Sequence, residues 1–107
     1  MAAACAEQAV PLTLRGAGTG NYGQCVPLAG GVVLDLSGLQ GVRQIDPHSG
    51  LLEAEAGCRL ADLDRALAPH GRALRLVPST WRTATLGGFI AGGSGGIGSL
   101  RWGFLRD

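Results

Sequence analysis

Apolar residues repeat along this chain with two different periods, and these periods predict the order of its elements. In GGVVLDLS, Val32, Leu34 and Leu36 share one face, which is the two-residue period of a strand. The short apolar segment PLTL at 11–14 predicts another strand before it. VRQID and LLEAEA flank the turn residues PHSG at 47–50 and therefore predict a hairpin.

A helical period follows the hairpin, in LADLDRALAPHG. Leu60, Leu63 and Leu67 recur at the spacing i, i+3, i+7, acidic residues stand in the first turns, and Gly71 is placed to end the helix. LRLVPST then predicts an extended strand that stops at its proline. TLGGFIAG predicts a short helix beginning near Thr85. The order strand, strand, hairpin, helix, strand, short helix indicates an α+β fold and not a regular βαβ alternation.

The spacing G-x-G-x-x-G occurs twice, at 18–23 and 93–98. A Rossmann dinucleotide site needs an amphipathic helix directly after such a loop. After the first match come Pro27, the pair Gly30–Gly31 and then the strand pattern, so no helix is expected there. A loop between two strands instead offers a nest of backbone N–H groups that binds an anion without a helix. A glycine-rich connection without any ligand is the other interpretation of this loop.

The second glycine-rich stretch also has two interpretations. A helix that begins at Thr85 has free N–H groups in its first turn, and these form an anion-accepting end. Gly87 and Gly88 are equally typical of a place where two segments pack closely. The match at 93–98 is followed by SLRWGF, which is not the opening of an amphipathic helix.

Composition and charge exclude several classes of protein. A chain of 107 residues is at most one small domain, and its formal net charge of +1 gives no reason to expect nucleic acid or an anionic membrane as a partner. Three cysteines form neither a disulfide framework nor a metal knuckle, which favours a reducing cytoplasm. No secretory signal and no membrane span are expected.

Other side chains with catalytic or ligand chemistry are scattered. His48 lies in the predicted turn and His70 near the predicted helix end, and neither is paired with a cysteine or a carboxylate. We expect Trp81 and Trp102 to pack in a core or an interface. The sequence therefore predicts no metal site and no hydrolytic triad, and it leaves catalytic residues unassigned.

Taken in order, these segments resemble a known family. PLTLRGAGTGNYGQ, GGVVLDL, VRQIDPHSGLLEAEAG, LADLDRALAPHG, PST, ATLGGFIAGG and LRWGFLRD are similar to segments of FAD-linked oxidases and dehydrogenases. These enzymes share the FAD-binding domain of p-cresol methylhydroxylase and vanillyl-alcohol oxidase, and they include glycolate oxidase subunits and D-lactate dehydrogenases. The resemblance covers about residues 10–107. It implies that residues 1–107 are a partial domain of this type, a small mixed sheet with flanking helices truncated at both ends, without the substrate domain.

The resemblance also implies a cofactor site with two walls. The loop at 15–21 would wrap the FAD diphosphate, and the segment 78–94 would run from the diphosphate toward the isoalloxazine ring. No histidine or cysteine stands where some members attach FAD covalently, so the resemblance implies non-covalent FAD. The implied cofactor-binding residues are Arg15, Gly16, Ala17, Gly18, Thr19, Gly20, Asn21, Pro78, Thr85, Gly87, Gly88, Ala91, Gly92 and Ser94.

The function that the resemblance implies is the FAD-binding part of an oxidoreductase that oxidises a small alcohol or hydroxy acid. The partners would be FAD, a small substrate bound by a region absent from this chain, and an electron-acceptor protein as a further candidate. The 107 residues alone are then expected to be inactive. Two alternatives stay open: a non-catalytic remnant or binding module of the same fold, and an NAD-binding Rossmann domain.

Overall fold

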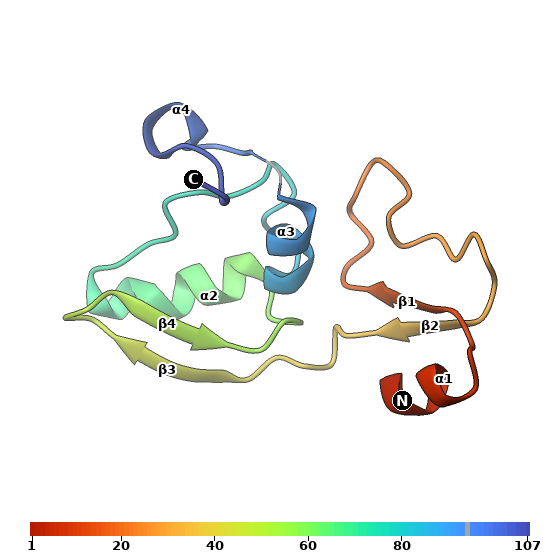
Figure 1. Cartoon of the computed structure of the whole chain (residues 1–107). Coiled ribbons are helices and arrows are strands. Elements are labelled where there is room, and N and C mark those ends of the chain that lie inside the picture. The colour runs from red at the N-terminus through yellow and green to blue at the C-terminus, as the bar shows by residue number, and fades with distance from the viewer. Residues whose placement is uncertain (94) are drawn as a thin grey trace.

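Short strands and helices alternate with long irregular segments in this chain (Figure 1). The computed structural model describes residues 1–93 and 95–107. In chain order the elements are α1 (Ala2–Glu7), β1 (Leu12–Arg15), β2 (Val32–Asp35), β3 (Val42–Asp46), β4 (Leu51–Ala54), α2 (Leu60–Leu67), the 3-10 helix η1 (Ala68–His70), α3 (Leu86–Gly92) and α4 (Ser99–Trp102).

The four strands form two separate two-stranded sheets. β1 and β2 run parallel, with Leu12 opposite Val32 and Arg15 opposite Asp35. β3 and β4 are the predicted hairpin, antiparallel around the turn at 47–50. The α+β class is therefore confirmed, and its strands divide between one parallel and one antiparallel pair.

The connection between β1 and β2 contains no helix. Residues 16–31 form turns and bends only, and they lead directly into β2. Parallel strands are usually joined through a helix that covers the sheet. A Rossmann site requires that helix immediately after its glycine loop, so the Rossmann alternative is wrong for this chain.

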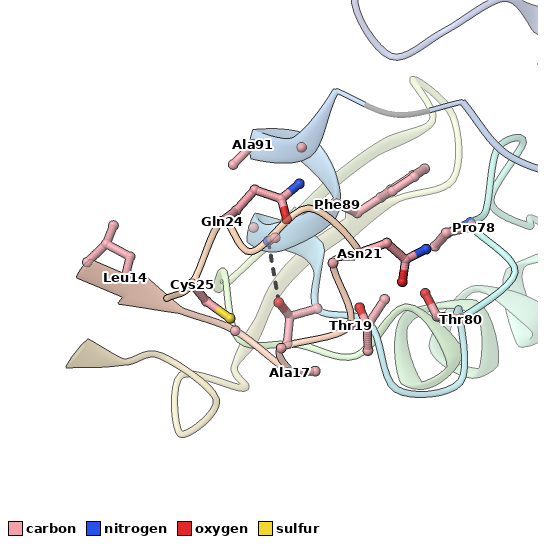
Figure 2. A pocket seen from close by; sticks show the side chains of 18 of the residues that line it. Leu14, Ala17, Thr19, Asn21, Gln24, Cys25, Pro78, Thr80, Phe89 and Ala91 are labelled. Atoms are coloured by element: carbon pink, nitrogen blue, oxygen red, sulfur yellow. Dashed lines mark hydrogen bonds between the residues drawn. The ribbon is translucent and has the colours of Figure 1, made fainter. Parts of the chain in front are cut away.

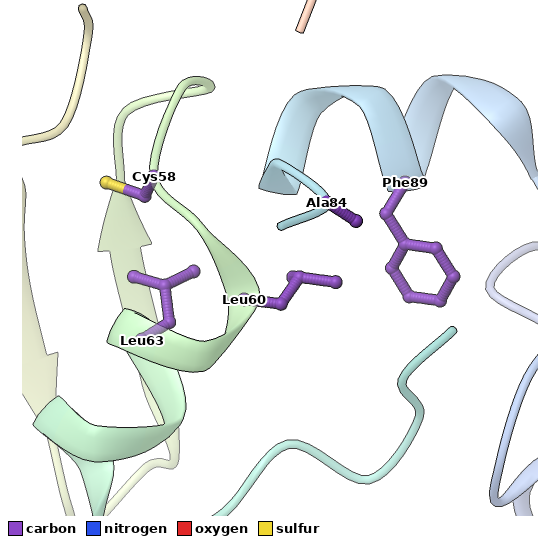
Figure 3. Close-up of a cluster of buried hydrophobic side chains, with 5 residues drawn as sticks. All are labelled: Cys58, Leu60, Leu63, Ala84 and Phe89. Carbon is purple, nitrogen blue, oxygen red and sulfur yellow. The ribbon is translucent and has the colours of Figure 1, made fainter. Parts of the chain in front are cut away.

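The core lies where α2 packs against the hairpin and the start of α3 (Figures 1 and 3). Leu60 and Leu63 are 1% and 0% exposed, and they meet Cys58, Ala84 and Phe89 in one buried cluster. Leu67 is also buried. The predicted apolar face of α2 is therefore confirmed, and burial of such leucines is the main source of stability in a small domain. Gly71 follows η1 in the predicted left-handed conformation, with φ of 65°.

The segment after η1 does not form the strand predicted at LRLVPST. Only Val77 pairs, in an isolated bridge with Ile97. Pro78 has no N–H group to continue a ladder, and the partner segment at 95–98 is mostly glycine, a poor strand former. The segment is extended, but it stays outside any sheet.

Two short helices were not predicted from the sequence. α1 lies in the alanine-rich start of the chain, and alanine has the highest intrinsic helix propensity. α4 has only four residues, too few for a period to be visible. In the part of the chain that the structure covers, no helix combines the length and the apolar character needed to cross a membrane.

The chain is less compact than its length suggests. Its radius of gyration is 15.3 Å, whereas a single domain of this size has about 13 Å. Figure 1 shows the reason: the β1–β2 pair lies to one side of the hairpin and α2, with α3 between them. The cavity described below opens at this place.

Two carboxylates hold the hairpin. Asp46 accepts hydrogen bonds from the Ser49 hydroxyl (2.6 Å) and the His48 N–H (2.9 Å), and these lower its pKa. Glu55 accepts from the Gly41 N–H (2.8 Å) and from Arg43 (2.7 Å), which likewise lower its pKa. Both side chains therefore stabilise the folded state more in their ionised form than in their protonated form.

These shifts predict acid sensitivity of the fold. A carboxylate with a lowered pKa in the folded state stabilises it above the ordinary values of 3.8 and 4.5 for Asp46 and Glu55. This contribution is complete above about pH 5 and is lost as the pH falls through the folded-state pKa. Asp46→Asn and Glu55→Gln should therefore lower the free energy of unfolding at neutral pH and flatten its fall in acid, measured by urea titration. Glu53→Gln is the control, since Glu53 makes no side-chain hydrogen bond among the described residues; equal flattening by this variant would contradict the assignment.

Candidate functional site

A cavity of about 1110 Å³ lies between the β1–β2 connection and α3 (Figure 2). One wall is the loop at 16–25, and the other is formed by α3 and the segments at 78–80 and 95–97. The first three residues of β1 (12–14), together with Leu36, Ala56, Ala84 and Thr85, complete the lining. Segments from distant parts of the sequence therefore meet around one space of ligand size.

The loop wall presents backbone donors that the protein itself does not use. Within the part of the chain that the structure describes, the N–H groups of residues 16–21 have no hydrogen-bond partner. Arg15 O accepts from the Leu36 N–H (2.8 Å) where the loop leaves β1, and the Val26 N–H donates to Gly23 O (3.0 Å) near its far end. Successive free N–H groups of this kind form a nest for an anion.

The conformation of this loop requires glycine at residue 18. Gly18 has φ of +69°, in the left-handed region that residues with a Cβ rarely adopt. The Arg15 guanidinium folds over it, since a Cβ at residue 18 would lie 3.2 Å from Nη2. The cation thus lies against Gly18, and Arg15 is not among the residues that line the cavity.

The start of α3 is confirmed at Thr85, but its donors are already in use. The Leu86 N–H donates to Cys58 O (2.8 Å), the Gly87 N–H to Ala56 O (2.8 Å), and the Gly88 N–H to Thr85 Oγ1 (3.3 Å). The expectation that this helix offers free N–H groups to an anion is therefore wrong.

Close packing accounts for one of the two adjacent glycines at the start of α3, Gly87 and Gly88. A Cβ on Gly87 would lie 2.8 Å from the Ala56 Cβ, closer than real Cβ atoms approach, so this position cannot take a side chain without a shift. Gly88 lines the cavity and meets only Thr85 Oγ1 at 3.1 Å. The absence of a side chain at Gly88 thus leaves room in the cavity itself.

The second G-x-G-x-x-G match also serves packing. A Cβ on Gly96 would overlap the carbonyl oxygen of Val77, and a Cβ on Gly98 would overlap that of Arg75. Gly95 lies against the ring of Phe104. Side chains on Gly96 and Gly98 would prevent the segment 95–98 from packing against 75–78. The same segment places Gly95 and Gly96 on the cavity wall.

The cavity lining carries no formal charge. Its residues include neither Asp, Glu, His, Lys nor Arg, and its polar groups are hydroxyls, amides and backbone atoms. Figure 2 shows Thr19, Asn21 and Thr80 close together beside Pro78, with Leu14 and Cys25 toward the other end. Gln24 lies on the side of Cys25, and the Phe89 ring lies on the side of Asn21. An anion held here would be bound by neutral dipoles, without a carboxylate nearby to repel it.

Most of the predicted site residues meet in this cavity. Arg15 is outside the lining, and Ser94 lies outside the described residues. The sequence did not single out Tyr22, Gln24, Cys25, Thr80 and Phe89, which also line it. Their only signal is position: in or beside the glycine loop, in the PST segment at 78–80, or inside the predicted helix. The predicted residues on the lining are Gly16, Ala17, Gly18, Thr19, Gly20, Asn21, Pro78, Thr85, Gly87, Gly88, Ala91 and Gly92.

The remaining candidate residues lie away from this cavity. His48 and His70 are exposed, one in the hairpin turn and one in η1. Trp81 packs against the buried cluster, as expected, and the Trp102 ring contacts the guanidinium groups of Arg75 and Arg101, each 4.8 Å from the ring centroid. Among residues 1–93 and 95–107, no group of three potential metal ligands comes together.

Comparison with known proteins agrees with this geometry. A family model described as FAD binding domain matches residues 1–107. A D-lactate dehydrogenase of Archaeoglobus fulgidus is 35% identical over 101 residues, and the match covers 94% of this chain and 22% of that protein. A glycolate oxidase subunit of Bacillus subtilis is 33% identical over 103 residues, covering 96% of this chain and 22% of the relative. This chain thus spans about a fifth of the length of these relatives.

Two further similarities extend the comparison. A D-2-hydroxyglutarate dehydrogenase of Pseudomonas putida is 39% identical over 101 residues, which are 94% of this chain and 10% of that protein. A solved structure of an alkyldihydroxyacetonephosphate synthase has a TM-score of 0.84 at 23% identity and covers 96% of this chain and 21% of its own. At that identity the match shows the fold alone.

The packing role of the second glycine cluster can be tested with one substitution. Gly96→Ala should lower the free energy of unfolding by about 1–3 kcal/mol, because the new methyl group overlaps the Val77 carbonyl. Gly38→Ala is the matched control: nothing lies within 4 Å of a Cβ there, so we expect a change within about 0.5 kcal/mol. Denaturant titration measures both. Equal effects would contradict the packing role of Gly96.

Proposed function

Since the chain belongs to the FAD-binding domain family, as its resemblance to FAD-linked oxidases and dehydrogenases predicts, we propose that it binds FAD in this cavity as part of an oxidoreductase. The observation that carries the proposal is the row of backbone N–H groups at 16–21, which lack partners in the described chain and border the cavity. A diphosphate needs donors of this kind, and it needs a backbone that it can approach closely.

The residues of the cavity fit FAD. The glycine-rich loop offers backbone donors, and a Cβ on Gly88 of the opposite wall would meet only Thr85 Oγ1, so the cavity is open at that residue. The Thr19 and Thr80 hydroxyls and the Asn21 amide supply hydrogen-bonding groups near Pro78. A dinucleotide has a charged centre and two ring systems, and this mixture of bare backbone, hydroxyls and apolar side chains suits it.

Within this proposal the chain binds and orients while the cofactor carries the redox chemistry. When bound, FAD would supply the hydride-accepting group of the reaction. The loop at 16–21 holds the diphosphate through its N–H groups, and α3 with segment 78–80 forms the opposite wall and excludes water. Because the lining contains no carboxylate and no imidazole, we infer that the group accepting the substrate's hydroxyl proton comes from another part of the protein.

The substrate class follows from what the relatives are named for. D-lactate, glycolate and D-2-hydroxyglutarate are all 2-hydroxy acids. We propose a 2-hydroxy acid as the substrate, ahead of a simple alcohol, and an electron-acceptor protein as the partner that reoxidises the flavin. Because the chain spans about a fifth of these relatives, both proposals concern the whole protein.

Non-covalent attachment and a cytoplasmic location belong to the same proposal. Neither histidine borders the cavity, which supports non-covalent FAD, although Cys25 does line it. Cys5, Cys25 and Cys58 are all free thiols, and this supports a reducing compartment.

The proposal predicts a yellow protein that releases its flavin. Protein expressed from its complete reading frame should show flavin absorbance, and acid precipitation should leave FAD in the supernatant. Flavin retained in the precipitate, and lost in Cys25→Ser, would replace non-covalent binding by a covalent bond to that thiol. Colourless protein that does not respond to added FAD would contradict the proposed function.

A binding module without catalysis is the second candidate, supported by the uncharged lining. The same flavoprotein distinguishes the two functions. Addition of D-lactate, glycolate or D-2-hydroxyglutarate under anaerobic conditions should bleach the oxidised flavin in an oxidoreductase and leave it unchanged in a module. Sequence beyond Asp107 adds a direct check, because an oxidoreductase of this family requires a long open frame there.

The uncharged lining also predicts how FAD affinity depends on conditions. With no carboxylate or imidazole at the cavity, the dissociation constant should change by less than about threefold between about pH 5.5 and 7.5. Added salt up to about 0.5 M should have an equally small effect, because screening acts on charges more than on local dipoles. Fluorescence titration of the apoprotein with FAD measures both. A tenfold change in either series would assign binding to a charged group instead.

A further inference from the structure

Thr85 is buried between the two walls of the cavity, although it is a polar residue. It is 3% exposed, and its Oγ1 accepts the Gly88 N–H at 3.3 Å. The same side chain touches Gly16 of the opposite wall. A Cβ on Gly16 would overlap Thr85 Oγ1 and lie 3.4 Å from the Thr85 Cβ. The glycine loop and the start of α3 therefore meet at these two residues.

The Thr85 side of this contact is held firmly by the core. Thr85 forms a backbone bridge with Arg59. On its two sides, Ala84 O accepts the Leu60 N–H at 3.0 Å and the Leu86 N–H donates to Cys58 O at 2.8 Å. A side chain anchored by bonds on both flanks has little freedom to move away from a neighbour.

The Gly16 side has few other constraints. The preceding residue is fixed through Arg15 O, which accepts the Leu36 N–H. Beyond Gly16, the N–H groups as far as residue 21 make no hydrogen bond within the described chain. The contact with Thr85 is thus the place where this loop rests on the core.

We propose that Thr85 is a positioning residue that sets the distance between the loop at 16–21 and α3, and so aligns the loop N–H groups for a diphosphate. Thr85 acts through Gly16 and does not itself contact the diphosphate. Gly16 is then a glycine because Thr85 occupies the place of its side chain, and not because a ligand approaches it. This inference rests on the proposed FAD function.

A double-mutant cycle on the full protein tests the proposal, with FAD affinity as the readout. Gly16→Ala should weaken FAD binding by about tenfold or more, because the methyl group pushes the loop away from Thr85. Thr85→Ala removes Oγ1 and should weaken binding by about threefold. The double variant G16A/T85A should bind more tightly than Gly16→Ala alone, since the space is free again. The double variant G16A/T85S keeps Oγ1 and should show no such relief.

The free energy of unfolding of the same variants is measured in the absence of FAD. Gly38→Ala is the control for adding a methyl group at a glycine with open space around it. If the cycle shows coupling between Gly16 and Thr85 in the free energy of unfolding, but the wild-type protein does not bind FAD, the proposed function is wrong while the contact between the two residues stands. If the wild-type protein binds FAD and the losses of binding free energy in Gly16→Ala and Thr85→Ala simply add in the double variant, the inference is overturned. Should Gly16→Ala fail to fold, Thr85→Ala is compared with Thr85→Ser; weaker FAD binding by the alanine variant supports the proposal, and equal affinities overturn it.

Discussion

Backbone hydrogen bonds between two segments far apart in the sequence hold the start of α2 against the start of α3. The Leu60 N–H donates to Ala84 O, and the Leu86 and Gly87 N–H groups donate to Cys58 O and Ala56 O, at 2.8–3.0 Å. Two-stranded sheets are marginally stable by themselves. In this chain, these hydrogen bonds between 56–60 and 84–87 therefore connect the elements that a larger sheet connects in other folds. Cys58, Leu60 and Ala84 also belong to the buried cluster. The position of α3, and with it one wall of the cavity, depends on these bonds.

Local patterns in the sequence predicted the elements that carry strong periods. The leucine spacing of α2, the turn residues of the hairpin and the threonine before α3 each act within a few residues, so they are visible without the fold. The separation of the strands into two pairs is not visible, because it depends on contacts between distant segments. The same is true of the packing glycines. The match at 93–98 resembles a nucleotide loop in its spacing, while Ala56 and Val77, the neighbours that exclude a side chain at Gly87 and Gly96, lie far away in sequence.

The candidate site was likewise predictable where local patterns mark it and not where it depends on contacts between distant segments. The sequence identified the loop and α3 as its two walls, because glycine clusters and the family resemblance both mark them. It could not show that the Leu86 and Gly87 N–H groups at the start of α3 are already bonded to Cys58 and Ala56, which leaves the loop as the source of donors in the proposed site. Nor could it show that the Arg15 guanidinium lies against Gly18 while Arg15 stays outside the described lining, which has no charged residue. Both facts depend on three-dimensional neighbours.

The helix-free connection between β1 and β2 has a thermodynamic consequence. In most parallel pairs a crossover helix satisfies its own backbone and covers the sheet, but here the N–H groups of residues 16–21 make no hydrogen bond within the described chain. A ligand that takes those groups becomes part of the folded structure, and its binding free energy adds to the stability of the chain. Folding and cofactor occupancy are then one linked equilibrium, in which the free FAD concentration sets how much of the protein exists in its native form.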